Sequence, residues 1–311
     1  IELKHLQPIN VDEEKAKFMK SNSYNPQFVY EPVKLPFRKL NNLKFGYRPI
    51  DIIMKTKAKE IKAQFLMRKF LGTSKFTRFS KRVYGFPSDE LVKKAQTFTD
   101  DVPSKIRDDI KGKITSAQVK KIFEREVSYF APKWEVEEAN IIAKAMVNPA
   151  TKRVYIKANE TFSKNQVDRL IAHEIYGHVL RSVCGSLQPY KMFSIGLAKY
   201  EATEEGLAMY KEKKIGGLSK RVLKGYAGRV LAVHYALNSS FRETYKKLFK
   251  NYSKEKSWQM TLRAKRGLGD TSKKGAFTKD HIYLKGYLDV GSFIKNASSL
   301  HLLHYGKISI G

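Results

Sequence analysis

The segment NQVDRLIAHEIYGHVLRSV constrains this chain more than any other, because it places His173, Glu174 and His178 in one predicted helix. Zinc-binding helices of the HExxH type carry two histidines four positions apart, on one helical face. Here the spacing is five, which on a regular α-helix separates the two rings by roughly 140° around the axis. A π-bulge, for which Gly177 is suited, would reduce this angle to about 40°. The motif predicts either a bulged metal-binding helix or two ordinary histidines.

The apolar residues of the same helix support the bulge independently. Ile171, Ile175, Val179 and Val183 recur every four residues, so they would drift around the axis of a regular helix. A one-residue bulge would realign them on a single face.

A carboxylate downstream of this helix would complete a set of three ligands. The segment YEATEEGLAMY contains Glu205 in an E-x-x-A pattern, and sites with two histidines commonly take a carboxylate from a following helix. Glu205 is the predicted third ligand. Glu201 lies one turn earlier on the same face, as either a supporting residue or the ligand itself. Glu204 would point elsewhere on the helix, where it could support the site or assist the helix N-terminus behind Thr203.

The cysteine content limits the kinds of ligand that could hold a metal ion, and therefore the reaction that the ion could support. One cysteine in 311 residues excludes a thiolate-rich site, so a metal here needs histidine and carboxylate ligands. Zn²⁺ on His173, His178 and Glu205 would leave one position open, where the pKa of a bound water falls towards about 7. Glu174 would take the proton from that water and pass it to a leaving amine. Metal-assisted amide hydrolysis is the predicted reaction class.

The pattern of elements predicts an α+β fold that is mainly helical, with a small antiparallel sheet beside the zincin-like active-site helix. Strands are expected at 134–136 and 154–157, where β-formers alternate, and nearly everything after residue 166 is helical. Residues 1–110 would form an N-terminal extended segment with basic helices, and residues 111–311 the zinc metallopeptidase domain. The apolar stretches are shorter than the roughly 20 residues of a membrane span, so no membrane partner is expected.

The charge balance favours negatively charged partners. Sixty Lys and Arg against 30 Asp and Glu give a net charge of +30, and such a field speeds encounters with polyanions. A composition bias that serves only solubility explains the excess equally well. The charge is spread along the chain, so it does not by itself locate a binding surface.

Three motifs in one order resemble a known family. HEIYGHVLR, TEEGLA and RAKRGLGDTSKKGAFTKDHIYLKG are similar to the HExxxH zinc metallopeptidases that include the microtubule-associated tyrosine carboxypeptidases and bacterial QEGLA-motif proteins. The resemblance covers roughly residues 140–290. It implies zinc held by His173, His178 and Glu205, with Glu174 as the base. It also implies release of a C-terminal tyrosine from an acidic tail such as that of α-tubulin.

A carboxypeptidase also needs a cation for the terminal carboxylate of its substrate. Arginine suits this role because its guanidinium binds both oxygens at once, and Arg263 and Arg266 are the predicted residues, with Lys265 and Lys279 beside them. Tyr283 is the predicted hydroxyl donor to the tetrahedral oxyanion. Basic proteins carry such clusters routinely, so a solvated surface is the alternative for each residue.

Two other functions stay open beside a zinc carboxypeptidase that acts on an acidic C-terminal tail. One is a zinc endopeptidase or other amide hydrolase with an open cleft. The other is a basic protein that binds a polyanion or a filament and whose metal site is not catalytic. A carboxylate such as Glu174 beside a three-ligand site favours an enzyme, because structural zinc usually fills all four positions. We expect a cytoplasmic protein with microtubules as a candidate partner; nucleic acid suits the charge but is not favoured.

Overall fold

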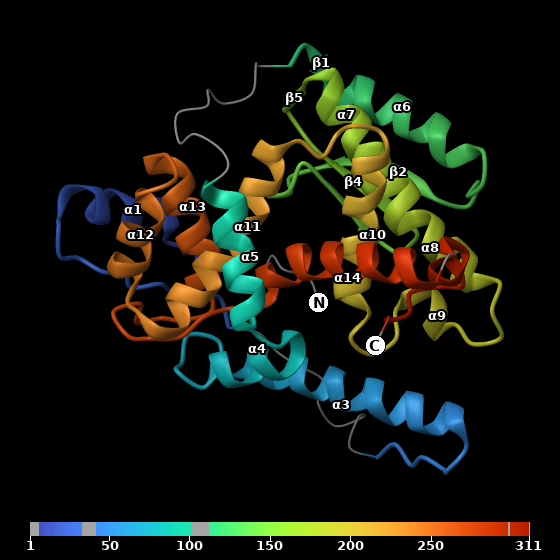
Figure 1. The fold of residues 1–311 in the computed structure, drawn as a ribbon, viewed down its shortest axis with the longest axis horizontal. Helices are drawn as coiled ribbons and strands as arrows, with labels where there is room; N and C mark the ends of the chain where they lie inside the picture. Colours follow the sequence, from blue (N-terminus) through green and yellow to red (C-terminus); the bar gives the residue numbers. More distant parts are fainter. Residues whose placement is uncertain (1–5, 33–41, 101–111, 298, 311) are drawn as a thin grey trace. The chain divides into compact units, whose positions relative to one another are not determined.

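The computed structural model describes residues 6–32, 42–100, 112–297 and 299–310 of the chain (Figure 1). The fold is α+β and mainly helical, as the sequence predicts. Unit 1 comprises Ile1–Ile106 and Lys220–Leu284, and unit 2 comprises Arg107–Ser219 and Lys285–Gly311. Each unit is therefore assembled from two stretches of the chain, and the functional division at residue 110 stays a prediction. None of the helices in the described ranges combines the length and hydropathy needed to cross a bilayer.

The described part of unit 1 is built from helices. They are α1 (Val11–Lys20), α3 (Pro49–Lys69), α4 (Phe76–Tyr84), α5 (Asp89–Asp100), α11 (Lys220–Asn238), α12 (Phe241–Phe249), α13 (Lys254–Lys265) and the 3-10 turn η3 (Lys279–His281). α3 packs along α4, and α11 contacts α5, α12 and α13. Aromatic side chains fill the core: the ring of Phe18 lies 5.1 Å from that of Phe241 and 5.0 Å from that of Trp258. Contact between such rings adds about 0.5–1.5 kcal/mol per pair to the burial term.

Unit 2 contains the sheet, whose strand order is β2 (Glu135–Ala139), β4 (Arg153–Lys157), β3 (Ala145–Asn148). β3, which the sequence did not predict, runs antiparallel to β4, whereas the two predicted strands, β2 and β4, run parallel with Val136 opposite Val154. The sheet is therefore mixed, and the prediction of an entirely antiparallel sheet was wrong on this pair. Alternation of apolar residues shows that a strand is half-buried, but it carries no information on strand direction. A second, two-stranded sheet pairs β1 (Ile114–Thr115) with β5 (Thr161–Phe162).

Helices complete unit 2 and hold its core. They are α6 (Ser116–Ser128), α7 (Lys164–Leu170), the π-helix η2 (Ile171–Val179), α8 (Leu180–Ser186), α9 (Met192–Ile195), α10 (Tyr200–Lys214), most of α14 (Ile282–Ala297) and η4 (Leu300–His304). α6 packs on strands β2 and β4 (Figure 1). Its buried Phe123 joins Ile156 of β4 and Ile175 of η2 in one apolar cluster. A capping box of Ser163 and Gln166 starts α7, which gives the metal-binding helix a defined beginning.

Candidate metal centre

The histidine helix leaves α-helical geometry over nine residues, from Ile171 to Val179. The amide of Leu180 donates to the carbonyl of Ile175, five residues earlier, which is the hydrogen-bond pattern of a π-helix. His173 and His178 both lie inside this stretch, and their ring centroids are 4.8 Å apart. The bulge predicted from the five-residue spacing is confirmed, although it extends over more residues than a single insertion.

The apolar side of this helix follows the predicted alignment. Ile175 and Val179 are fully buried in the apolar cluster of unit 2, and Ile171 and Val183 pack against the same cluster. The wider turn therefore directs one set of residues into the core and leaves the histidine rings together on another side.

Glu205 of α10 meets the two imidazoles. Its Oε2 atom lies 3.3 Å from His173 Nε2 and 3.8 Å from His178 Nε2, and one ligand atom from each residue lies within 4.8 Å of the others. Donors about 2.1 Å from a tetrahedral ion are about 3.4 Å apart, so the spacing suits a zinc ion. The three side chains keep 12–13% of their surface exposed, so none of them is fully buried. Within the described part of the chain, this group does not include Glu201.

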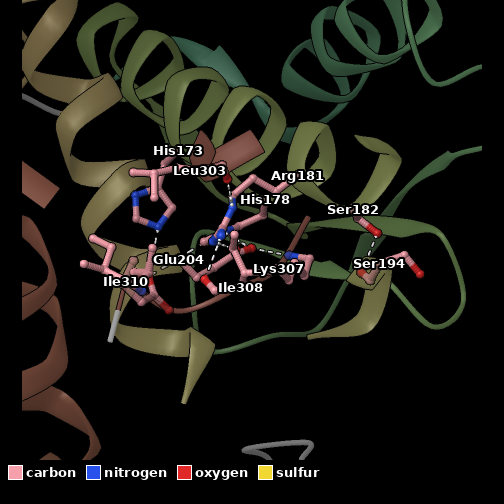
Figure 2. Close-up of polar contacts among 12 residues, drawn as sticks. His173, His178, Arg181, Ser182, Ser194, Glu204, Leu303, Lys307, Ile308 and Ile310 are labelled. Atoms are coloured by element: carbon pink, nitrogen blue, oxygen red, sulfur yellow. Dashed lines mark hydrogen bonds and ion pairs between the residues drawn. The ribbon is translucent and has the colours of Figure 1, made fainter. Parts of the chain in front are cut away.

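A second carboxylate holds the far nitrogen of each imidazole. His173 Nδ1 lies 2.7 Å from Glu212 Oε1. His178 Nδ1 lies 2.9 Å from Oε1 of Glu204, and Figure 2 shows these two residues side by side. An ionised carboxylate only accepts hydrogen bonds, so Nδ1 of each ring is the donor to its carboxylate, and Nε2 is the nitrogen that faces Glu205. Carboxylate–imidazole pairs of this kind orient metal-ligating histidines in proteins.

Nearby cations keep both supporting carboxylates ionised. Burial alone would raise the pKa of Glu204, but the charges of Lys307 and Arg181 overcome this effect and hold the pKa far below its usual range. Burial likewise opposes ionisation of Glu212, whereas its hydrogen bond to His173 and the charge of Arg169 lower its pKa. Both groups therefore accept hydrogen bonds at neutral pH.

Two glycines allow the close helix contacts that position Glu205. A Cβ atom on Gly177 of η2 would lie 2.9 Å from the Cβ atom of Ala208 on α10. A Cβ atom on Gly206 would lie 2.1 Å from the carbonyl carbon of Gly286 on α14. Both distances are shorter than a normal carbon–carbon contact of about 3.5–4.0 Å. α10 is therefore held by backbone-level contacts on both sides of its metal-facing turn.

The remaining acidic residues of the motifs take distinct positions. Glu174 lies in the π-helix beside His173 and is 8% exposed. α10 begins at Tyr200, so Thr203 and Glu204 lie inside the helix. The expectation that Glu204 could assist the helix N-terminus behind Thr203 was therefore wrong. The Thr203 hydroxyl instead accepts a hydrogen bond from the amide of Ile310. The predicted roles of Glu174 and Glu201 stay predictions.

The residues predicted to bind the substrate lie in unit 1. Arg263 donates to both carboxylate oxygens of Asp280, at 2.5 and 2.8 Å, and Arg266 is buried with its guanidinium over the ring of Phe277. Lys265 Nζ is fully buried and donates to three backbone carbonyls, an arrangement that favours a structural role.

Two further predicted residues of unit 1 lie against aromatic rings. Lys279 Nζ is 5.6 Å from the ring centroid of Tyr84, and Tyr283 stacks on Tyr226 at 5.7 Å. Substrate binding by any of these basic residues and by Tyr283 stays a prediction.

The sequence motifs did not predict several residues of the metal centre. Glu212 follows Glu205 by seven positions, two helical turns along the same face of α10, and this spacing could have pointed to it. Arg169 precedes His173 by one turn and donates to Glu212 at 2.7 Å. Arg181 and Lys307 carry no comparable signal in the sequence.

Known proteins match this chain over most of its length. Residues 16–311 match the family described as microtubule-associated tyrosine carboxypeptidase. Microtubule-associated tyrosine carboxypeptidase 1 of Mus musculus is 27% identical over 98% of this chain and 59% of its own length, and the Homo sapiens protein of that name is 25% identical over the same shares. Putative tyrosine carboxypeptidase MATCAP2 of Mus musculus is 27% identical over 98% of this chain and 53% of its own length.

The chain spans between half and two thirds of the length of these relatives. The family match, by contrast, extends over nearly all of the chain, including the π-helix and α10. The chain belongs to the microtubule-associated tyrosine carboxypeptidase family.

Proposed function

We propose that this protein is a zinc metallo-carboxypeptidase that releases a C-terminal residue, tyrosine or another aromatic one, from an acidic protein tail such as that of α-tubulin. The observation that carries the proposal is the convergence of His173, His178 and Glu205 from η2 and α10. The names of the relatives support carboxypeptidase chemistry on tyrosine.

The donor set fits zinc. Two imidazole nitrogens and one carboxylate oxygen are the ligands of many catalytic zinc sites, which keep a fourth position for water or substrate. His173 and His178 would bind through Nε2, because Nδ1 of each ring is engaged by a carboxylate. Zinc held there would polarise the scissile carbonyl and lower the pKa of a water molecule.

The protein's own residues would complete the reaction. The Glu174 carboxylate would accept a proton from the attacking water and deliver it to the amide nitrogen of the leaving residue. Glu212 and Glu204 would keep the imidazoles in one tautomer and one orientation throughout. Each acidic residue of the centre would then have a separate role, because Glu205 binds the metal, Glu174 moves the proton, and the other two orient the ligands.

The charge of the chain supports an acidic substrate. A net charge of +30 would raise the encounter rate with a tail rich in glutamate, and the effect should weaken as salt screens it. The microtubule in the relatives' names makes a tubulin tail the first substrate to test.

The proposal is tested with zinc-loaded protein and peptides that end in glutamates and one tyrosine, followed by mass spectrometry. We expect loss of a single tyrosine and no cleavage of the amidated peptide. Glu174→Gln should keep its zinc but lose at least about 100-fold in kcat, the usual contribution of a general base. Equal cleavage of free and amidated peptides would indicate an endopeptidase. Tight, salt-sensitive binding of polyanions without any cleavage would indicate a binding protein.

A further inference from the structure

A buried arginine forms hydrogen bonds with both the C-terminal segment, Leu303–Ile310, and a carboxylate of the metal centre. Arg181 follows the π-helix on α8 and is fully buried. Its guanidinium donates to the carbonyls of Leu303 and Ile308, at 2.8 and 2.9 Å, and to Glu204 Oε2 at 2.5 Å (Figure 2). One side chain therefore binds two points of the C-terminal segment and the carboxylate that supports His178.

Lys307 reaches the same carboxylate from within that segment. It is 2% exposed, and its Nζ donates to Glu204 Oε1, the same oxygen that lies 2.9 Å from His178 Nδ1 (Figure 2). The backbone around it is fixed as well: the Lys307 amide donates to Phe193 at 2.7 Å, and its carbonyl accepts from Leu197 at 2.9 Å. The backbone of Lys307 is thus fixed at both its amide and its carbonyl, which limits the positions that its ammonium group can take around Glu204.

The two metal-ligating histidines share one supporting arrangement. Arg169, Glu212 and His173 form a chain of cation, carboxylate and imidazole, and Arg181, Glu204 and His178 form another. An isolated buried ion pair often contributes little to stability, and a carboxylate without its cation would be costly to bury. The repetition of the arrangement on both ligands favours a role in orienting the rings.

We infer that Lys307 and Arg181 are positioning residues for the metal ligand His178, and that the C-terminal segment from Leu303 to Ile310 is thereby part of the metal centre. The inference rests on the proposed metal function. The two cations fix the Glu204 carboxylate in one orientation, and Glu204 in turn fixes the ring of His178 with Nε2 towards Glu205. Loss of Lys307 would free one carboxylate oxygen to rotate away from the imidazole.

The test compares Lys307→Met, which keeps the length of the side chain but removes its charge, with Lys307→Arg and Lys285→Met. Lys285 pairs with Asp289 on the exposed side of α14, so its variant is the matched control for loss of a lysine. Zinc affinity is measured by competition with a chelator, and the coordination geometry by the visible absorption of the Co²⁺-substituted protein. We expect about tenfold weaker zinc binding and an altered Co²⁺ spectrum for Lys307→Met, a smaller change for Lys307→Arg and none for the control.

A measurement without metal keeps the inference testable if Lys307→Met fails to fold. Nitrogen-15 NMR of the metal-free wild type should show His178 protonated at Nδ1, and the Lys307→Met protein, if folded, a mixture of tautomers. A wild-type His178 without a proton on Nδ1 would overturn the inference, as would a folded variant with an unchanged protonation pattern of His178 and unchanged zinc affinity. If wild-type protein binds no zinc, the proposed function fails, whereas the tautomer of His178 still decides the positioning role.

Discussion

Replacement of Gly177 by alanine tests whether one helix contact sets the geometry of the metal centre. The added Cβ atom would lie 2.9 Å from Cβ and 3.2 Å from Cα of Ala208. Carbon atoms in ordinary contact are about 3.5–4.0 Å apart, so η2 and α10 would have to separate by about 0.6–1 Å. Overpacking costs about 1–3 kcal/mol, and removal of a helical glycine gains about 0.5–1 kcal/mol. We expect the free energy of unfolding to fall by about 1–2 kcal/mol.

The same separation should weaken zinc binding, because the ligands lie on both sides of the contact. His173 Nε2 on η2 and Glu205 Oε2 on α10 are 3.3 Å apart. Functional groups of a metal site need to be held within about 0.5 Å of their working geometry, and the expected shift exceeds this tolerance. We expect zinc affinity to fall by about tenfold or more.

Urea denaturation of the metal-free protein measures the stability change, and chelator competition measures the zinc affinity. The double variant Gly177→Ala/Ala208→Gly removes the shorter of the two contacts and should recover part of both, with a coupling energy of about 1–2 kcal/mol. Gly291→Ala on α14 is the matched control. Among the described residues, its Cβ atom would meet no atom within 4 Å beyond its chain neighbours and its own helix backbone. Unchanged stability and zinc affinity of Gly177→Ala would refute the reasoning.

Three further predictions concern the same unit. Glu205→Ala should weaken zinc binding by more than about 100-fold and Glu201→Ala by less than about tenfold, as measured by chelator competition; the reverse order would reassign the ligand. Glu212→Gln should weaken zinc binding by about 10–100-fold and leave His173 as a mixture of tautomers in nitrogen-15 NMR, and a single unchanged tautomer would contradict its role. Burial, aided by nearby cations, lowers the pKa of His304 from 6.5 to about 4. The folded protein therefore binds fewer protons there than the unfolded chain, and stability should decrease as the pH falls from about 6.5 to 4. The full shift corresponds to about 3 kcal/mol, which solvent screening reduces to about 1–2 kcal/mol. Urea denaturation at several pH values should show that the free energy of unfolding decreases less steeply for His304→Leu than for the wild type. An equally steep decrease would exclude this histidine as the cause.

The sequence by itself determined the features that depend on neighbouring residues. A five-residue spacing between His173 and His178 cannot place both rings at one ion on an α-helix, so the need for a wider turn follows from helix geometry alone. Thr115 and Gln118 form a capping box that starts α6, and this signal is equally local because the two residues are three positions apart. Glu205 could be selected because a carboxylate from a following helix is the usual complement to two histidines.

Tertiary structure alone decided what holds those ligands in place. Glu204 and Lys307 are 103 positions apart, and Arg181 and Leu303 are 122 apart, so no periodicity in the sequence relates them. The parallel pairing of β2 with β4 and the composition of each unit from two chain segments are decided in the same way. Local patterns report which face of a helix or strand is buried, but the partner on that face is set by packing across the whole unit.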